Sequence, residues 1–191
     1  MKLIARKLMA LALVSFASTA NFAIADDADK SAVSKQAANY FAQLYTKTCV
    51  KYADDLNVLK TQLTQASVPE LSQAKAKMFL DNKPGTVWVI PNVFGDMLLS
   101  IDTKNTCVLY SRHLNINHIE NAFIAEAENG PSSLIYHKVQ DETVPTKLGP
   151  MHVIRYVMTD TNKNTKKNYQ LITSKADAVE IQIKASVSII H

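Results

Sequence analysis

The chain has 191 residues, of which 47% are apolar and 20% are charged, with four glycines and no low-complexity tract or internal repeat. This length and composition predict one globular domain with a sizeable core and exclude a low-complexity chain. The net charge is +4, from 21 Lys and Arg against 17 Asp and Glu. Three of the bases, Lys2, Arg6 and Lys7, lie at the amino end, so the rest of the chain has 18 bases against 17 acids, a net charge of +1. This near-neutral balance predicts no nucleic-acid partner.

Residues 1–25 are predicted to be a secretory signal peptide. The amino-terminal bases precede an apolar run, 8–17, of the length that a signal h-region has, and Ala23-Ile24-Ala25 fits the pattern that signal peptidase cuts after. The run is shorter than the roughly 20 apolar residues of a transmembrane helix. We therefore expect cleavage near Ala25 (or Ala20), one mature domain over residues 26–191, a periplasmic or secreted location and no stable membrane span. An uncleaved amphipathic anchor is the alternative.

Helices are predicted in the first half of the mature chain. Apolar residues recur at helical spacing over residues 31–50. Asp54 or Asp55 is placed to cap a second helix, and Ser67 with Glu70 forms the capping-box pattern of a third. The apolar stripes of the three helices are Val33, Ala37, Tyr40, Phe41, Leu44 and Tyr45; Leu56, Leu59 and Leu63; and Leu71, Ala74, Met78 and Phe79.

Short apolar runs then predict an antiparallel meander of strands over residues 86–90, 97–101 and 106–112. Trp88 lies in the first run, and Phe94 lies in the loop that follows it. Aromatic side chains around such a loop can anchor a partner protein. The alternative is that both rings belong to the core.

A further helix is predicted from the cap pair Asn117 and Glu120 to the left-handed stop and breaker Asn129-Gly130-Pro131. In the last segment of the chain, apolar and polar residues alternate, which is typical of a strand with one buried and one solvated face. The strands predicted after the helix span residues 133–139, 151–159, 168–173 and 179–190. A basic cluster among them is predicted to be a solvated turn and consists of Lys163, Lys166 and Lys167.

These elements predict an α+β fold in which the amino-terminal helices pack on one face of a mostly antiparallel sheet. The last strand is a candidate edge that another chain could extend, and Lys184 in its middle would then protect that edge against aggregation. The candidate partner-binding residues are therefore Trp88, Phe94 and Lys184.

Cys49 and Cys107 are the only cysteines of the chain. In an exported protein such a pair is predicted to form a disulfide, here between the end of the first helix and the third strand. Closing a loop over residues 49–107 stabilises the fold by about 4 kcal/mol on the chain-entropy argument. The alternative is a catalytic cysteine with His113 as its base, for which the sequence offers no orienting partner.

No catalytic, metal-binding or cofactor motif is recognised in the sequence. The histidines do not form HxH or HExxH pairs, and Cys-x-x-Cys and G-x-S-x-G are absent. A metal site between His137 and His152 is the alternative if their strands are neighbours. Two acid pairs are predicted to be surface charges near helix ends, namely Asp54 with Asp55 and Glu126 with Glu128.

The chain between Cys49 and Arg112 has an early cysteine, the step Pro84-Gly85-Thr86-Val87-Trp88, and a second cysteine that opens the apolar run Cys107-Val108-Leu109-Tyr110-Ser111. This pattern resembles a family of small exported proteobacterial proteins, some of them lipoproteins, that has no assigned activity. The resemblance favours the pairing of the two cysteines. The chain departs from the lipoprotein members because it lacks a lipobox cysteine.

The leading functional hypothesis is a non-enzymatic binding or inhibitory protein of the periplasm that has a protein partner and needs no cofactor. An immunity protein against an envelope-targeting toxin is one such protein. One alternative is an accessory factor of envelope assembly or secretion. The other is a secreted hydrolase in which His113 or His152 acts in a pocket with Asp and Ser side chains.

Overall fold

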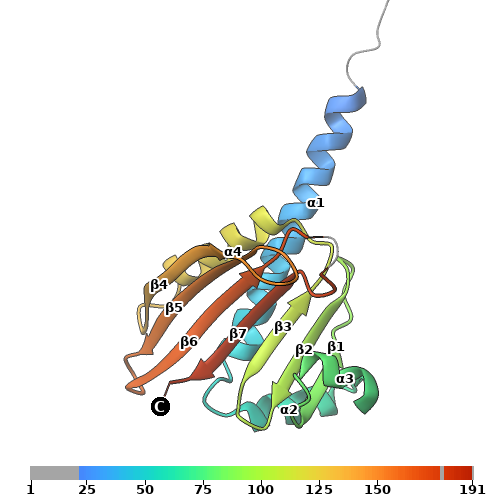
Figure 1. The fold of residues 1–191 in the computed structure, drawn as a ribbon. Helices are drawn as coiled ribbons and strands as arrows, with labels where there is room; N and C mark the ends of the chain where they lie inside the picture. Colours follow the sequence, from blue (N-terminus) through green and yellow to red (C-terminus); the bar gives the residue numbers. More distant parts are fainter. Residues whose placement is uncertain (1–21, 177–178, 191) are drawn as a thin grey trace, which may run out of the picture.

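The computed structural model describes residues 22–176 and 179–190 of the chain (Figure 1). Over these residues the chain forms four α-helices, one π-helical turn and a seven-stranded antiparallel sheet, which confirms the predicted α+β class. The apolar run of the predicted leader lies outside the described residues, and residues 22–25 begin the first helix. None of the helices in the described ranges is both long and apolar enough to cross a bilayer.

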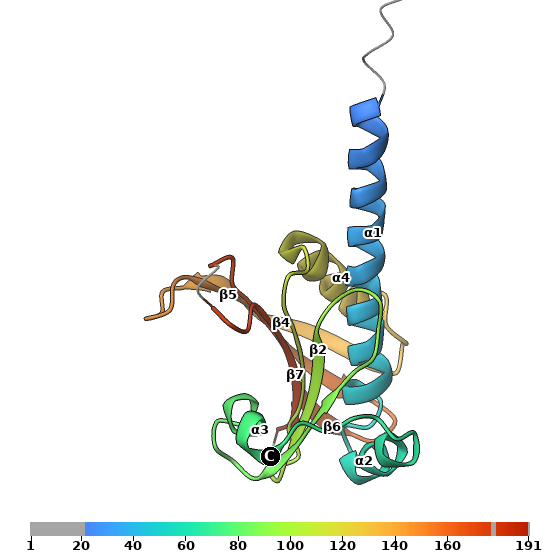
Figure 2. The same cartoon turned by 90° about the vertical axis from the view of Figure 1, so that its right-hand side faces the viewer.

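Helix α1 (Phe22–Tyr45) is longer than the sequence predicts, because it begins well before residue 31. The additional residues include alanines and contain neither Gly nor Pro, so no local signal stops the helix from extending. Figures 1 and 2 show that the amino-terminal part of α1 projects beyond the sheet, whereas its carboxyl-terminal part lies across one face. The buried residues of that second part are Ala37, Ala38, Phe41, Ala42 and Tyr45.

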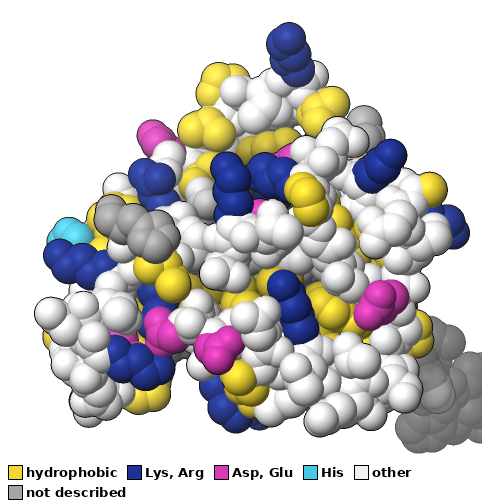
Figure 3. Space-filling model, turned by 90° about the horizontal axis from the view of Figure 1, so that it is seen from below, with side chains coloured by type: hydrophobic (Ala, Val, Ile, Leu, Met, Phe, Trp, Pro, Cys, Tyr) yellow, Lys and Arg dark blue, Asp and Glu magenta, His cyan; other side chains and the backbone are white. Residues whose placement is uncertain are grey.

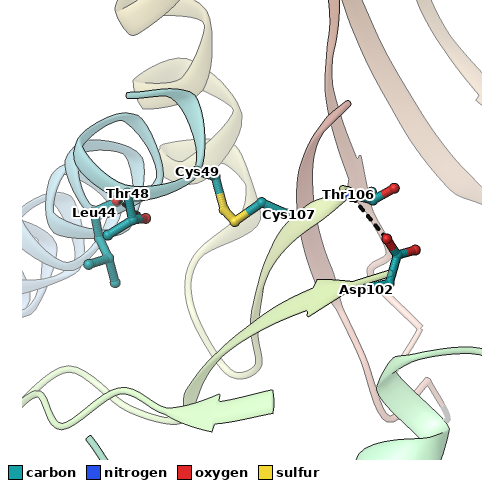
Figure 4. The surroundings of a disulfide bond; sticks show 6 residues. All are labelled: Leu44, Thr48, Cys49, Asp102, Thr106 and Cys107. Carbon is teal, nitrogen blue, oxygen red and sulfur yellow. Dashed lines mark hydrogen bonds between the residues drawn. A yellow bond between two sulfur atoms is a disulfide. The ribbon is translucent and has the colours of Figure 1, made fainter. Parts of the chain in front are cut away.

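A π-helical turn, η1 (Thr46–Val50), continues α1 and carries Cys49. The N–H of Lys51 donates to the carbonyl oxygen five residues earlier at 3.0 Å, which is the hydrogen-bond pattern of a π-helix. Cys49 is bonded to Cys107 at the start of strand β3 (Cys107–Ser111), with Cα atoms 5.3 Å apart, so the predicted disulfide is confirmed (Figure 4). Both cysteines are fully buried, and their bond fastens the end of the helical layer to the sheet.

Helix α2 (Leu56–Gln65) has its cap at Asp55, one of the two predicted positions. The Asp55 carboxylate accepts a hydrogen bond from the N–H of Asn57 at 3.1 Å, which satisfies one of the backbone donors that a helix start leaves unpaired. The predicted apolar stripe of α2 is buried and consists of Leu56, Leu59 and Leu63.

The predicted capping box at Ser67 and Glu70 is wrong. Ser67 adopts a φ of 53°, and residues 69–71 run beside strand β1 (Gly85–Val89), where Glu70 forms an isolated bridge. Two backbone hydrogen bonds of 2.8 Å join this segment to β1. Since these bonds hold the segment extended, helix α3 (Gln73–Phe79) begins only after it.

The sheet has the strand order β1-β2-β3-β7-β6-β5-β4, and every pair is antiparallel. The remaining bounds are β2 (Met97–Asp102), β4 (Leu134–Val144), β5 (Met151–Asp160), β6 (Thr165–Thr173) and β7 (Ile183–Ile189). The predicted meander of β1, β2 and β3 is confirmed. The prediction that the last strand is an edge protected by Lys184 is wrong, because β7 pairs with β3 on one side and β6 on the other. The alternation of apolar and polar residues indicates which face of a strand is solvated, but it does not indicate whether the backbone groups along its two edges are paired.

Helix α4 (Ile116–Glu128) lies beside α1 and ends at Asn129, just before the predicted Gly-Pro breaker. Its cap is Asn115 and not the predicted Asn117. The side-chain oxygen of Asn115 accepts a hydrogen bond from the N–H of His118 at 3.0 Å.

Aromatic rings fill the space between the helices and the sheet. Phe123 of α4 stacks on Tyr169 of β6 with ring centres 4.3 Å apart, and Tyr45 of α1 lies 5.3 Å from Tyr169. The prediction that the amino-terminal helices share one face of the sheet is wrong for α3, which packs against Val87 of β1 on the opposite face (Figure 2). That face leaves the strands from β7 towards β4 without a covering helix among the described residues. We call this second surface the open face.

The predicted solvated turn of Lys163, Lys166 and Lys167 is wrong for Lys167. The side chain of Lys167 is 2% exposed, because its pairing with Met158 of β5 places it on the face that the helices cover. Its ammonium lies 2.8 Å from one carboxylate oxygen of Asp54, and Lys163 donates to the other oxygen at 2.7 Å. Asp54, predicted to be a surface charge, therefore links the loop before α2 to the β5–β6 hairpin.

Candidate functional site

The three residues predicted to bind a partner lie in different places. Trp88 is 2% exposed and belongs to the core beneath the helices, which is the alternative that the sequence leaves open. Phe94 is half-buried against Tyr40 of α1, with ring centres 5.3 Å apart. Lys184 lies on the open face, with its ammonium 6.0 Å from the ring centre of Tyr110. The structure therefore does not bring the three side chains together.

Lys184 is the centre of a row of side chains that crosses the open face. Lys184 of β7 is opposite Tyr110 of β3 and Ile172 of β6. The row continues to Leu98 of β2 and Val153 of β5. Since neighbouring strands are about 4.8 Å apart, the row forms a largely apolar stripe about 20 Å long with one ammonium in its middle.

A groove follows this row between α3 and the segment that precedes β7. Its main cavity has a volume of about 330 Å³, and Phe79, Tyr110, Arg112 and Ile181 contribute to its lining. Adjoining cavities of about 230 and 120 Å³ share Phe79 and Tyr110 and extend to Lys184. The groove is therefore open to solvent along the sheet and has an aromatic wall.

The aromatic wall of the groove is held in place by contacts between α3 and β3. The rings of Phe79 and Tyr110 meet edge to face with centres 5.3 Å apart, and the Tyr110 hydroxyl donates to the carbonyl oxygen of Phe79 at 2.5 Å. Burial raises the pKa of Tyr110 to about 12, so the phenol stays protonated near neutral pH. The wall is therefore uncharged and fixed.

Basic side chains lie along the open face beyond the groove. Arg155 pairs in register with Gln170, Lys166 lies on β6, and Arg112 directly follows β3, so each shares the face of Lys184. The one acidic residue within β3, β5, β6 and β7 is Asp160, which is buried and accepts hydrogen bonds from the β5–β6 turn. Carboxylates also lie on this face: Glu142 of β4 is opposite Val153, and Asp81, Asp96, Asp102 and Glu180 border the groove near α3. Figure 3, which views the molecule from the end where α2 and α3 lie, shows basic and acidic side chains interspersed among apolar ones.

A second group of polar side chains lies on the helix-covered face. His152 of β5 bonds through Nδ1 to Glu120 of α4 at 2.9 Å and through Nε2 to Asp141 of β4 at 3.0 Å. The network extends at both ends, because the hydroxyl of Thr173 donates to Glu120 at 2.5 Å and Lys138 donates to Asp141 at 2.8 Å. A cavity of about 330 Å³ borders this group, and we call the group the His152 clasp.

The contacts of the clasp favour the protonated form of the His152 ring. Ionised carboxylates only accept hydrogen bonds, so contacts from one imidazole to two of them favour the ring that carries hydrogen on both nitrogens. Burial lowers the pKa of His152, but the hydrogen bonds and negative charges of Glu120 and Asp141 outweigh that effect and raise the pKa above its ordinary value. An imidazolium has no lone pair with which to act as a base. The contacts join α4 to the β4–β5 hairpin.

The other candidate histidines lie apart from the clasp. His137 is on β4, the neighbour of β5, but it pairs with Val157 and not with His152, so the predicted alternative of a shared metal site has no support in the register. The N–H of His113 donates to the side-chain oxygen of Gln182 at 3.0 Å. Cys49 and Cys107 are joined in the disulfide, so neither is a free thiol that His113 could activate. No group of three or more His, Cys, Asp and Glu side chains in residues 22–176 and 179–190 is arranged to hold a metal ion.

The sequence did not reveal the clasp or the groove. Glu120, Asp141 and His152 come from a helix and two strands, and no motif has their spacing. Several strands contribute residues to the groove, so these residues become neighbours only through the register of the strands. The alternation of β7 was the one usable signal, since it predicted a wet face that includes Lys184.

Comparisons of the chain with protein-family models, with curated proteins and with solved structures found no match.

Proposed function

We propose that this chain is a non-enzymatic binding or inhibitory protein of the periplasm, and that its open face binds a protein partner. The observation that carries the proposal is the asymmetry of the sheet. Helices α1, α2 and α4 bury one face, whereas the other presents a groove with an aromatic wall and carries basic side chains beyond it. A groove lined by aromatic and aliphatic side chains is the type of site into which a partner protein inserts an anchoring side chain.

The chemistry of the open face favours a partner that presents an apolar side chain flanked by carboxylates. The groove has room for one or two large side chains beside Phe79 and Tyr110. The Nε–H groups of Arg112 and Arg155 are buried and have no acceptor within the described residues. Both guanidinium groups carry a positive charge, so a docked carboxylate would be held by charge-assisted hydrogen bonds, which are about twice as strong as neutral ones.

The residue types of the face are those that dominate binding energy in protein interfaces. Tyr and Arg are enriched among the residues whose truncation costs most, and they act best when neighbouring contacts exclude water. Tyr110 and Arg112 lie together in the main cavity, and Arg155 lies further along the sheet. A stable scaffold with such a surface suits an immunity protein against an envelope-targeting toxin. An accessory factor of envelope assembly or secretion would use the same surface, and the identity of the captured partner distinguishes the two.

The test is site-specific photocrosslinking of the exported chain in living cells. A photoreactive residue replaces Gln170 on the open face in one variant and Val58 on the exposed side of α2 in a matched variant. We expect one discrete adduct from the Gln170 position and none from the Val58 position. The reverse result, or the same adducts from both positions, would overturn the proposal.

Charge reversal then tests the chemistry of the partner. Arg155→Glu with Lys184→Glu should lower the yield of the adduct about tenfold or more, since each substitution places like charges against the partner. Lys47→Glu with Lys60→Glu makes the same change of net charge on the helical side and should leave the yield unchanged. Equal yields from the two double variants, with matched thermal unfolding, would show that the open face does not bind an acidic partner.

A secreted hydrolase is the second candidate, and the cavity beside the His152 clasp is the observation that favours it. It requires that substrate binding release His152 from one of its carboxylates, so that a ring nitrogen can accept a proton. His152→Gln should then abolish turnover of ester, peptide or glycan substrates while leaving the photocrosslinked adduct intact. Turnover that survives this substitution removes the candidate.

A further inference from the structure

The two edge strands of the sheet differ in whether their outer backbone groups are paired. Strand β1 has its outer edge occupied, because residues 69–71 donate to it and accept from it through backbone hydrogen bonds of 2.8 Å. Strand β4, at the other edge, pairs only with β5 among the described strands. With 11 residues, β4 is also longer than any other strand of the sheet. The fold therefore covers its short edge and leaves its long edge unpaired.

The unpaired edge also exposes apolar side chains. Ile135 is 55% exposed and Val139 is 44% exposed, although both are β-branched residues that favour packed strands. Soluble proteins usually blunt a long edge or cover it, because its free N–H and C=O groups can pair with another chain. A long edge with exposed apolar side chains is therefore a candidate for strand pairing.

A bulge at Val139 decides how such a pairing would align. The register against β5 shifts between Lys138 and Gln140, so Val139 has no partner there. Lys138 is opposite the core residue Tyr156 and therefore points to the helix-covered face, whereas Gln140 is opposite Arg155 on the open face. Before the bulge, the odd-numbered residues of β4 lie on the open face. After the bulge, the even-numbered residues lie on that face.

One two-fold register of β4 with another β4 matches faces and chemistry together. If the axis passes between residues 139 and 140, Lys138 is opposite Asp141 of the second copy, and both side chains lie on the helix-covered face. In the same register His137 is opposite Glu142, and Ile135 is opposite Val144, both on the open face. The nearest other registers that keep both side chains of each pair on one face would place Lys138 opposite an uncharged residue, either Val139 or Thr143.

We propose that β4 pairs antiparallel with β4 of a second copy of this chain, about a two-fold axis between residues 139 and 140, so that the two sheets become continuous. Each charged, polar and apolar pair then occurs twice, as an isologous contact requires. Lys138 and Asp141 already bond within one strand at 2.8 Å, and a carboxylate has capacity for further donors across the axis. The open faces remain uncovered, so this dimer and the proposed partner binding are independent of each other.

Sedimentation equilibrium of the oxidised, exported chain over a wide concentration range tests the pairing. We expect a reversible monomer–dimer equilibrium. Glu142→Lys, which removes the carboxylate opposite His137 in both symmetry-related pairs, should raise the dimer dissociation constant about tenfold. Glu128→Lys makes the same change of charge on exposed α4 and should leave the constant unchanged.

The swap of charges identifies the register. His137→Glu should weaken the dimer, because two carboxylates then face each other, and His137→Glu combined with Glu142→Lys should restore it, because a carboxylate then faces an ammonium. Hydrogen exchange of the amides of residues 134–144 should slow as the concentration of the wild-type chain rises. A chain that sediments as a monomer throughout, a dimer that is insensitive to Glu142→Lys, or a swap that does not restore association would each overturn the proposal.

Discussion

At the scale of single residues, the buried ammonium of Lys167 depends on Asp54. Burial raises the pKa of the Asp54 carboxyl, but hydrogen bonds from Lys163 and Lys167 outweigh this and hold its pKa below the ordinary value. Asp54→Ala should lower the free energy of unfolding by about 2 to 3 kcal/mol, because it leaves the Lys167 charge buried without a counter-charge. Urea unfolding of the oxidised chain measures this change.

Two further substitutions isolate the cause of that loss. Lys163→Ala removes the more exposed partner of Asp54 and should cost less than about 1 kcal/mol. Lys167→Met replaces the buried charge with an apolar side chain of similar length, leaves Asp54 paired with Lys163, and should be close to neutral. If Asp54→Ala and Lys163→Ala cost the same, the buried charge is not the reason.

The His152 clasp predicts a pH dependence of stability. Its folded-state pKa lies above the unfolded value of about 6.5, so its contribution is complete below that pH and is lost as pH rises through the folded-state pKa. The difference in unfolding free energy between wild type and His152→Gln should therefore be about 1 to 2 kcal/mol near pH 6 and should shrink towards pH 9. Urea unfolding of both chains at several pH values measures it.

At acidic pH, the stability that the clasp contributes depends on the ionisation of Asp141. A hydrogen bond from Lys138 is the main cause of its lowered pKa, so the carboxylate stays ionised at pH 6 and its stabilising contribution is lost only at acidic pH. His137→Gln, on the other face of the same hairpin, should leave the profile as it is in wild type. A gap between wild type and His152→Gln that widens as pH rises from 6 to 9 contradicts the ionised clasp.

At the scale of elements, the disulfide sets how the helical layer is attached to the sheet. It joins η1 to β3 across a sequence separation of 58 residues. Replacing Cys49 and Cys107 with alanine should lower the free energy of unfolding by about 4 kcal/mol, mainly because the unfolded chain regains the freedom that the loop removes. Urea unfolding with and without a reductant measures the effect.

The reductant is also the control. Reduced wild type should unfold at about the same urea concentration as the double alanine variant, and the variant should not respond to reductant. A loss below about 1 kcal/mol would mean that η1 and β3 are held together by packing alone.

The errors in predicting elements have a common cause. Asp55 caps α2 as predicted because the groups involved are neighbours in the chain. Ser67 and Glu70 have an equally good local pattern, but backbone bonds to β1 take that segment into the sheet. A cap contributes about 1 kcal/mol, so a pairing with a distant strand readily overrides it.

At the scale of the whole molecule, β7 holds the sheet together. It lies between β3 and β6, so without it β1–β3 and β6–β4 have no strand in common. A chain that ends at Gln182 should lose cooperative unfolding, whereas a chain that ends at Ile190 should keep it, as measured by circular dichroism during heating. Cooperative unfolding of the shorter chain near the wild-type temperature would show that the two halves are stable without their central strand.

The sequence by itself determined the α+β class, the meander and the identity of the disulfide, since two cysteines permit one pairing, and it narrowed the α2 cap to Asp54 or Asp55. Helical stripes, strand alternation and caps involve residues within a few positions of each other, and they follow directly from the order of the residues. Only the tertiary structure decided that β7 is central, that Lys167 is buried against Asp54, and that Glu120, Asp141 and His152 form a clasp. These features depend on strand order and register, which arise when distant segments compete for the same hydrogen-bonding edges, and the free energies that settle that competition are not local.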